Sequence, residues 1–142
     1  MDQQARDRFD GLLEEALEQL PPRIKSLLDE VPLVVEDVPS DKLTDELIAE
    51  LGLHEGETRD EFRDGLCGLH SGVSITERST DQPPEMPEEI RIFRSGIVSL
   101  AGGWDQDDAD DWVYEEIMVT LLHEIGHHFG LDEEQLTELG YD

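Results

Sequence analysis

The sequence predicts an α+β fold in a single domain, with several helices packed on a small β-sheet and a metal-site helix near the C-terminus. Its 142 residues fit one domain, and the 37% of apolar residues are enough to form a core. Segments with helical periodicity dominate, and the few β-branched segments do not alternate with them in a regular βαβ order. We therefore expect one domain over residues 1–142.

The N-terminal half is expected to hold four helices and one strand. Apolar residues at helical spacing predict a first helix that ends at Pro21–Pro22, a short second helix over Arg23–Glu30 and a third over Asp41–Leu51. Leu33–Val38 is rich in β-branched residues and predicts a strand. Thr58–Glu61 has the pattern of a capping box, which predicts another short helix.

The middle of the chain gives weaker signals. Cys67–Glu77 mixes glycine and serine with apolar residues and predicts no definite element, whereas three prolines in Ser79–Glu89 indicate a loop. Ile90–Arg94 alternates apolar and charged residues and predicts a strand. Ile97–Leu100 is expected to extend this strand past Gly96.

A long helix is predicted over Asp111–Phe129, with Asp110 as its N-cap and Gly130 as its stop. Acidic residues in its first turn suit the positive end of the helix dipole. Asp132–Gln135 resembles a second capping box and predicts a final short helix.

The charge balance excludes several classes of partner. There are 37 Asp and Glu residues against 10 Lys and Arg residues, for a formal net charge of -27. Such a surface repels nucleic acid and anionic membranes. It attracts basic proteins and peptides, and its simpler interpretation is a solvated acidic coat that maintains solubility.

No apolar run is long enough to span a membrane, and the N-terminus lacks the basic start and apolar stretch of a signal peptide. We therefore expect a cytoplasmic protein. Cys67 is the only cysteine, so no internal disulfide can form. Its apolar surroundings in the sequence favour a packing role over that of a nucleophile or a metal ligand.

The segment His123–His127 matches the motif H-E-x-x-H. Residues four apart lie on one face of a helix, so His123 and His127 are positioned to bind one metal ion. Glu124 lies about 100° further round the helix, where it is positioned to act as general base towards a metal-bound water.

The rest of the predicted helix supports this interpretation. Glu116 and Thr120 fall in nearly the same direction as His123 and His127. The opposite side is apolar and suits the core: Tyr114, Met118, Leu121, Ile125 and Phe129. His128 lies near the edge of the apolar face and is expected to pack or to support the metal ligands. The remaining histidines, His54 and His70, are expected in loops, and His70 is a weaker candidate donor to an oxyanion.

The stretch that begins at His123 resembles the extended zincin pattern H-E-x-x-H-x-x-G-x-x-[H/D]. Gly130 stands at the glycine position, where the chain must turn back towards the metal. The last ligand position falls on Glu133, which the resemblance therefore implies as the third ligand. Glutamate is a competent zinc ligand, but its extra methylene changes its reach, so Asp132 and Glu134 stay open as alternatives.

The segment His127–Asp132 resembles the bacterial minimal-zincin family of small single-domain metallopeptidases. Leu20–Pro22, Val34–Asp37 and Leu69–Ser79 are also similar to that family, so the resemblance covers most of the chain. No methionine follows His127, so the methionine turn of larger metzincins is absent. The resemblance implies a zincin-like fold, a Zn2+ cofactor and hydrolysis of peptide bonds, although other divalent metals also bind such sites.

Three hypotheses for function follow. The first is a zinc-dependent peptidase that acts on peptides or proteins, especially basic or extended ones, with Glu124 as general base. In this hypothesis the Ile90–Arg94 strand pairs with an extended substrate, as edge strands do in peptide recognition. The second is a non-enzymatic zinc-binding module whose acidic surface binds a basic partner. The third is an acidic interaction protein with a vestigial metal site. An intact Glu124 favours the first, because a structural zinc site needs no base.

Overall fold

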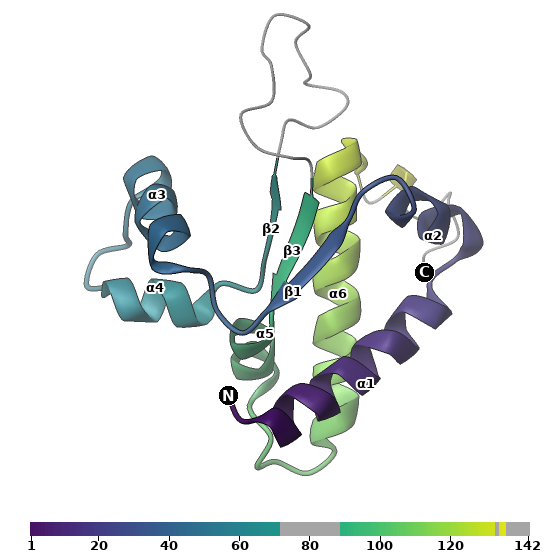
Figure 1. Cartoon of the computed structure of the whole chain (residues 1–142), viewed down its shortest axis with the longest axis horizontal. Coiled ribbons are helices and arrows are strands. Elements are labelled where there is room, and N and C mark those ends of the chain that lie inside the picture. The colour runs from purple at the N-terminus through teal and green to yellow at the C-terminus, as the bar shows by residue number, and fades with distance from the viewer. Residues whose placement is uncertain (72–88, 133, 136–142) are drawn as a thin grey trace, which may run out of the picture.

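The computed structural model describes residues 1–71, 89–132 and 134–135, and for residues 69–71 it describes the backbone alone. The helices begin and end where local chemistry dictates. Ser40 and Thr58 cap the helices that follow them by accepting the backbone N–H groups of Leu43 and Glu61. The elements run in the order α1 (Gln3–Gln19), α2 (Pro22–Leu28), β1 (Leu33–Glu36), α3 (Asp41–Leu51), α4 (Arg59–Gly65), β2 (Gly68–Ser71), β3 (Glu89–Phe93), α5 (Arg94–Ala101) and α6 (Ala109–Phe129) (Figure 1).

The three strands form one mixed sheet in the order β1-β3-β2. β1 runs parallel to β3 with Leu33 opposite Ile90, and β2 runs antiparallel to β3 with Gly68 opposite Ile92. β3 is therefore the central strand. The expected pairing of an extended substrate with Ile90–Arg94 is wrong, because β1 and β2 already occupy both sides of β3.

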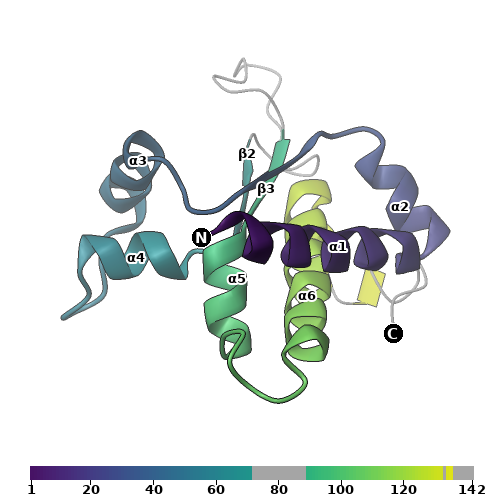
Figure 2. The ribbon, with the colours of Figure 1, turned by 60° about the horizontal axis from the view of Figure 1, so that its bottom comes forward.

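The core lies between the sheet and the helices α1, α5 and α6 (Figures 1 and 2). α6 contacts β2, β3, α1 and α5, so the predicted metal-site helix lies at the centre of the packing. The predicted alternation in β3 is confirmed, because Ile90 and Ile92 are buried and Arg91 is half-buried. Together these features confirm the predicted α+β fold. The buried cluster comprises Phe9, Leu13, Ala16, Leu20, Ile24, Val31, Ile90, Ile92, Ile97, Val98, Val113, Ile117, Leu121, Leu122, Ile125 and Phe129.

The expected extension of the β3 strand through Ile97–Leu100 is wrong, because these residues belong to helix α5. Ile97 and Val98 are β-branched, which favours a strand locally. As a helix, however, the segment buries both side chains together with Gly96 against the core, while Leu100 is exposed. Tertiary packing thus overrides the local preference.

Helix α6 begins two residues earlier than predicted, and Asp110 is not its N-cap. Asp108 takes that position, in the left-handed conformation with φ 57°. Asp110 lies in the first turn, and its carboxylate accepts a hydrogen bond from Arg8 Nε of α1 at 2.6 Å. The Asp110 carboxylate therefore links α6 to α1 through an ion pair.

A network of ion pairs connects α1, the end of β1 and α5. Arg94 donates to Asp10 at 2.9 Å and to Asp37 at 3.0 Å, and Arg6 lies 2.7 Å from Asp37. The hydrogen bond from Arg6, with the second one from Arg94, lowers the pKa of the Asp37 carboxyl below its usual value. The network links the first helix to the start of the helix that packs beside α6.

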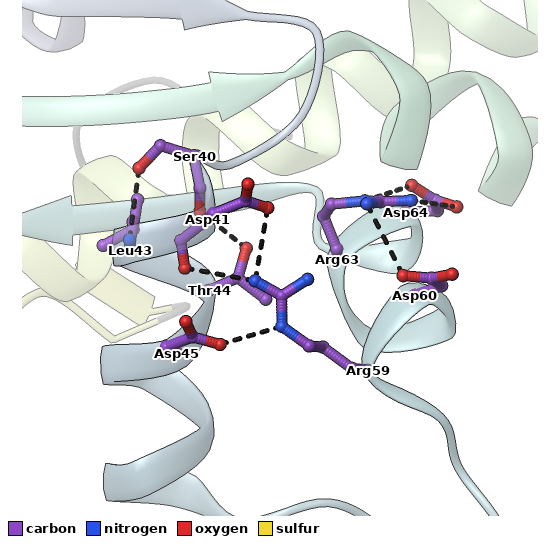
Figure 3. Close-up of polar contacts among 9 residues, drawn as sticks. All are labelled: Ser40, Asp41, Leu43, Thr44, Asp45, Arg59, Asp60, Arg63 and Asp64. Atoms are coloured by element: carbon purple, nitrogen blue, oxygen red, sulfur yellow. Dashed lines mark hydrogen bonds and ion pairs between the residues drawn. The ribbon is translucent and has the colours of Figure 1, made fainter.

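Helices α3 and α4 lie on the other side of the molecule from α1 and α2 (Figures 1 and 2). Arg59 of α4 donates to Asp45 at 2.8 Å and to Asp41 at 3.2 Å, which connects the two helices (Figure 3). Arg63 pairs with Asp64 at 2.9 Å within α4. Two of the few basic residues are thus engaged with carboxylates here.

Among the described helices, none combines the length and the apolar character that a membrane span requires.

Candidate metal centre

Helix α6 places His123 and His127 side by side on its exposed face. The centroids of the two imidazole rings are 4.3 Å apart, and the ring planes meet at 63°. Four residues make just over one turn, so the spacing alone brings the two side chains to the same side of the helix. The structure therefore places the two rings next to each other, as the sequence predicts.

The opposite side of α6 is buried in the core, which confirms the predicted apolar face. Leu121, Ile125 and Phe129 are buried. His128 is 1% exposed and its ring packs edge-on against Phe129 with centroids 5.0 Å apart, so its predicted packing role is confirmed. Because this face is fixed in the core, the exposed pair His123 and His127 is held on a rigid support.

Helix α6 ends at Phe129, two residues after the second histidine of the motif. Gly130 adopts the left-handed conformation with φ 67°. The N–H of Leu131 donates a hydrogen bond to the carbonyl of Gly126 at 2.6 Å, and the N–H of Gly130 donates one to the carbonyl of His127 at 3.3 Å. These two bonds form a Schellman motif, which reverses the chain at a residue without a Cβ. The predicted helix stop at Gly130 is confirmed.

The predicted third ligand, Glu133, lies outside the described residues. Of the two alternatives, Asp132 caps the residues that follow it, because its Oδ1 accepts the N–H of Gln135 at 2.8 Å and its own N–H bonds to the Gln135 side chain at 2.9 Å. This reciprocal pair confirms the second predicted capping box. Glu134 is exposed. Across the described ranges, no three metal-binding side chains gather in one place.

The two histidines fit a zinc ion in chemistry and in placement. Neutral imidazole nitrogen is a common zinc ligand at about 2.0–2.1 Å, so two such nitrogens around a tetrahedral ion lie about 3.3 Å apart. With ring centroids 4.3 Å apart, the two side chains lie close enough together to reach the same ion. Both side chains are exposed, so an ion has access to them. A third protein ligand must come from outside this pair.

Strand β2 lies directly against the part of α6 that carries the motif. A Cβ added to Gly68 would lie 2.9 Å from Glu124 Cγ and 3.0 Å from Thr120 Cγ2. Thr120 is accordingly buried, although the sequence placed it on the polar face with the histidines. The sequence does not reveal this contact, because a single glycine in a segment without periodicity does not indicate what it packs against.

Cys67 precedes Gly68, is half-buried and packs at the border of the core, which confirms its predicted packing role. Burial raises the pKa of its thiol, and the nearby carboxylates of Glu116 and Glu124 raise it further. The thiol therefore stays protonated at neutral pH.

The two remaining histidines lie outside α6. His54 lies in the connection between α3 and α4, as predicted. His70 belongs to strand β2, so its expected position in a loop is wrong. β2 was not predicted because it is short and is stabilised by pairing with β3, which is distant in the sequence.

The comparisons with known proteins identify a family for most of the chain. A family model described as zincin-like metallopeptidase matches residues 28–141, which includes every element from β1 to α6. No curated protein matches the chain.

Proposed function

Because the chain belongs to the zincin-like metallopeptidase family, we propose that it is a zinc-dependent peptidase in which His123 and His127 bind the metal and Glu124 is the general base. The family implies a zinc cofactor and a hydrolase. The observation that carries the assignment of residues is the adjacent pair of exposed imidazoles on α6, with the Schellman turn at Gly130 three residues after His127.

Each side chain has a distinct task in this proposal. A bound zinc ion would supply a Lewis acid that polarises the scissile carbonyl and lowers the pKa of a coordinated water. His123 and His127 hold the ion on the rigid helix. Glu124 lies next to them on the β2 side, accepts the proton of the attacking water and passes it to the leaving amine. Glu133 is proposed as the third ligand.

The substrate is proposed to be a peptide or protein with basic character. The net charge of -27 attracts cationic chains and raises their rate of encounter. Among the described strands, β2 lies at an edge of the sheet and next to the motif, so an extended peptide that pairs with β2 would pass beside Glu124. β2 therefore takes the place of Ile90–Arg94, which is central in the sheet, as the strand that pairs with a substrate.

The proposal predicts metal-dependent hydrolysis. Protein purified with zinc is expected to cleave members of a library of short basic peptides, to lose activity on chelation and to regain it when zinc is restored, because the reaction requires the ion. The measurement is mass spectrometry of the products. If chelation unfolds the protein while no peptide is cut at any stage, the zinc is structural and the protein is a binding module.

A further inference from the structure

Gly68, the first residue of β2, allows the strand to lie against the catalytic side of α6. A Cβ at this position would come within 2.9 Å of Glu124 Cγ, 3.0 Å of Thr120 Cγ2 and 3.3 Å of the backbone oxygen of Arg91. Separations this short between carbon atoms are repulsive, since carbon pairs prefer about 3.5–4.0 Å. The strand and the helix therefore have this spacing because residue 68 has no side chain.

Neither neighbour of Gly68 is free to move away. On one side Gly68 pairs with Ile92, which is fully buried in the central strand, and the carbonyl of Cys67 accepts the N–H of Phe93 at 2.8 Å. On the other side is α6, whose Thr120 is 7% exposed. The space available to the methylene stem of Glu124 is thus bounded by backbone that is held in place by the sheet and the core.

We propose that Gly68 is a positioning residue for Glu124: the bare backbone of β2 forms the wall against which the stem of this glutamate rests. The inference depends on the proposed role of Glu124 as base. Confinement at Cγ restricts rotation about the bonds that precede it, and this determines where the carboxylate lies. A misplacement of about 1 Å costs on the order of 10²-fold in rate, so the wall contributes to catalysis without touching the substrate.

The test is Gly68→Ala, with Gly65→Ala as a matched control. Gly65 lies three residues earlier, and a Cβ added there meets nothing within 4 Å. In Gly68→Ala the new methyl group displaces the Glu124 stem, so kcat is expected to fall about 10–100-fold while KM changes little and zinc content is unchanged. Gly65→Ala is expected to keep the wild-type kcat. A Gly68→Ala protein with wild-type kcat overturns the inference.

A double-mutant cycle separates positioning from general damage. If Gly68 acts through Glu124, Gly68→Ala is expected to have little further effect on kcat in a Glu124→Gln background. A full additional 10–100-fold loss in that background overturns the inference. If Gly68→Ala does not fold, adding Thr120→Ser removes the Cγ2 contact and leaves the Glu124 contact. The folded double variant is then expected to show the same loss of kcat, and wild-type kcat in it overturns the inference.

Cobalt substitution gives a readout that does not depend on hydrolysis. Gly68→Ala and Glu124→Gln are both expected to shift the visible absorption bands of the cobalt protein, whereas Gly65→Ala keeps the wild-type spectrum. An unchanged spectrum in Gly68→Ala overturns the positioning role. A wild type that binds cobalt and zinc and hydrolyses no peptide overturns instead the proposed peptidase function, so the two failures are distinguishable.

Discussion

Glu124→Gln is expected to lower kcat about 10²–10⁴-fold while the protein keeps its zinc and its fold. Glutamine has nearly the same shape, so the packing against Gly68 is preserved. It has no carboxylate to accept a proton, so the general base is lost. Zinc content is expected to stay at the wild-type value, because Glu124 is adjacent to the metal ligands in the motif and is not one of them.

The measurement is kcat and zinc content for wild type, Glu124→Gln and Glu115→Gln. Glu115 is an exposed carboxylate on the same helix, so its replacement makes the same change in charge away from the proposed base. We expect wild-type kcat in this control. Equal activity in Glu124→Gln and wild type contradicts the proposed mechanism, and equal losses in both variants point to an effect of net charge.

Gly96→Ala is expected to destabilise the protein by about 3 kcal/mol, the upper end of the range for overpacking. A Cβ at this position would lie 2.1 Å from the backbone oxygen of Leu66 and 2.6 Å from its carbonyl carbon. These atoms belong to backbone, so no side chain can rotate to relieve the contact. The start of α5 and the end of α4 must therefore move apart.

Thermal unfolding measures this effect, with an expected loss of about 10 °C in Tm. Gly11→Ala in α1 is the matched control, because a Cβ there meets nothing within 4 Å and alanine favours a helix over glycine by about 1 kcal/mol. The control is expected to gain slightly in Tm. A Gly96→Ala protein that also gains in Tm shows that α4 and α5 lie further apart than these distances indicate.

The metal-site helix is the part of the structure that the sequence predicts best. Its periodicity is local, so the exposed positions of His123 and His127 and the burial of Ile125 follow from a period of 3.6 residues. Gly130 ends the helix for an equally local reason, since only the left-handed conformation satisfies both carbonyl groups. The adjacent pair of histidines is thus determined within a single segment.

The parts that the sequence does not predict depend on contacts between distant segments. Ile97 and Val98 favour a strand by themselves, and their helical conformation is stabilised by burial next to α6. Gly68 and Thr120 meet across 52 positions in the sequence, and no local pattern indicates this contact. The contact between β2 and Glu124 can therefore be recognised only in the folded structure.

Zinc content after mutation tests the central claim most directly. Wild-type protein and His54→Ala, purified without added metal, are expected to carry about one zinc ion per chain, because His54 lies in the connection between α3 and α4 and is not part of the motif on α6. His123→Ala and His127→Ala are each expected to carry almost none. Retention of stoichiometric zinc by both of these variants would contradict the assignment of the metal to this helix.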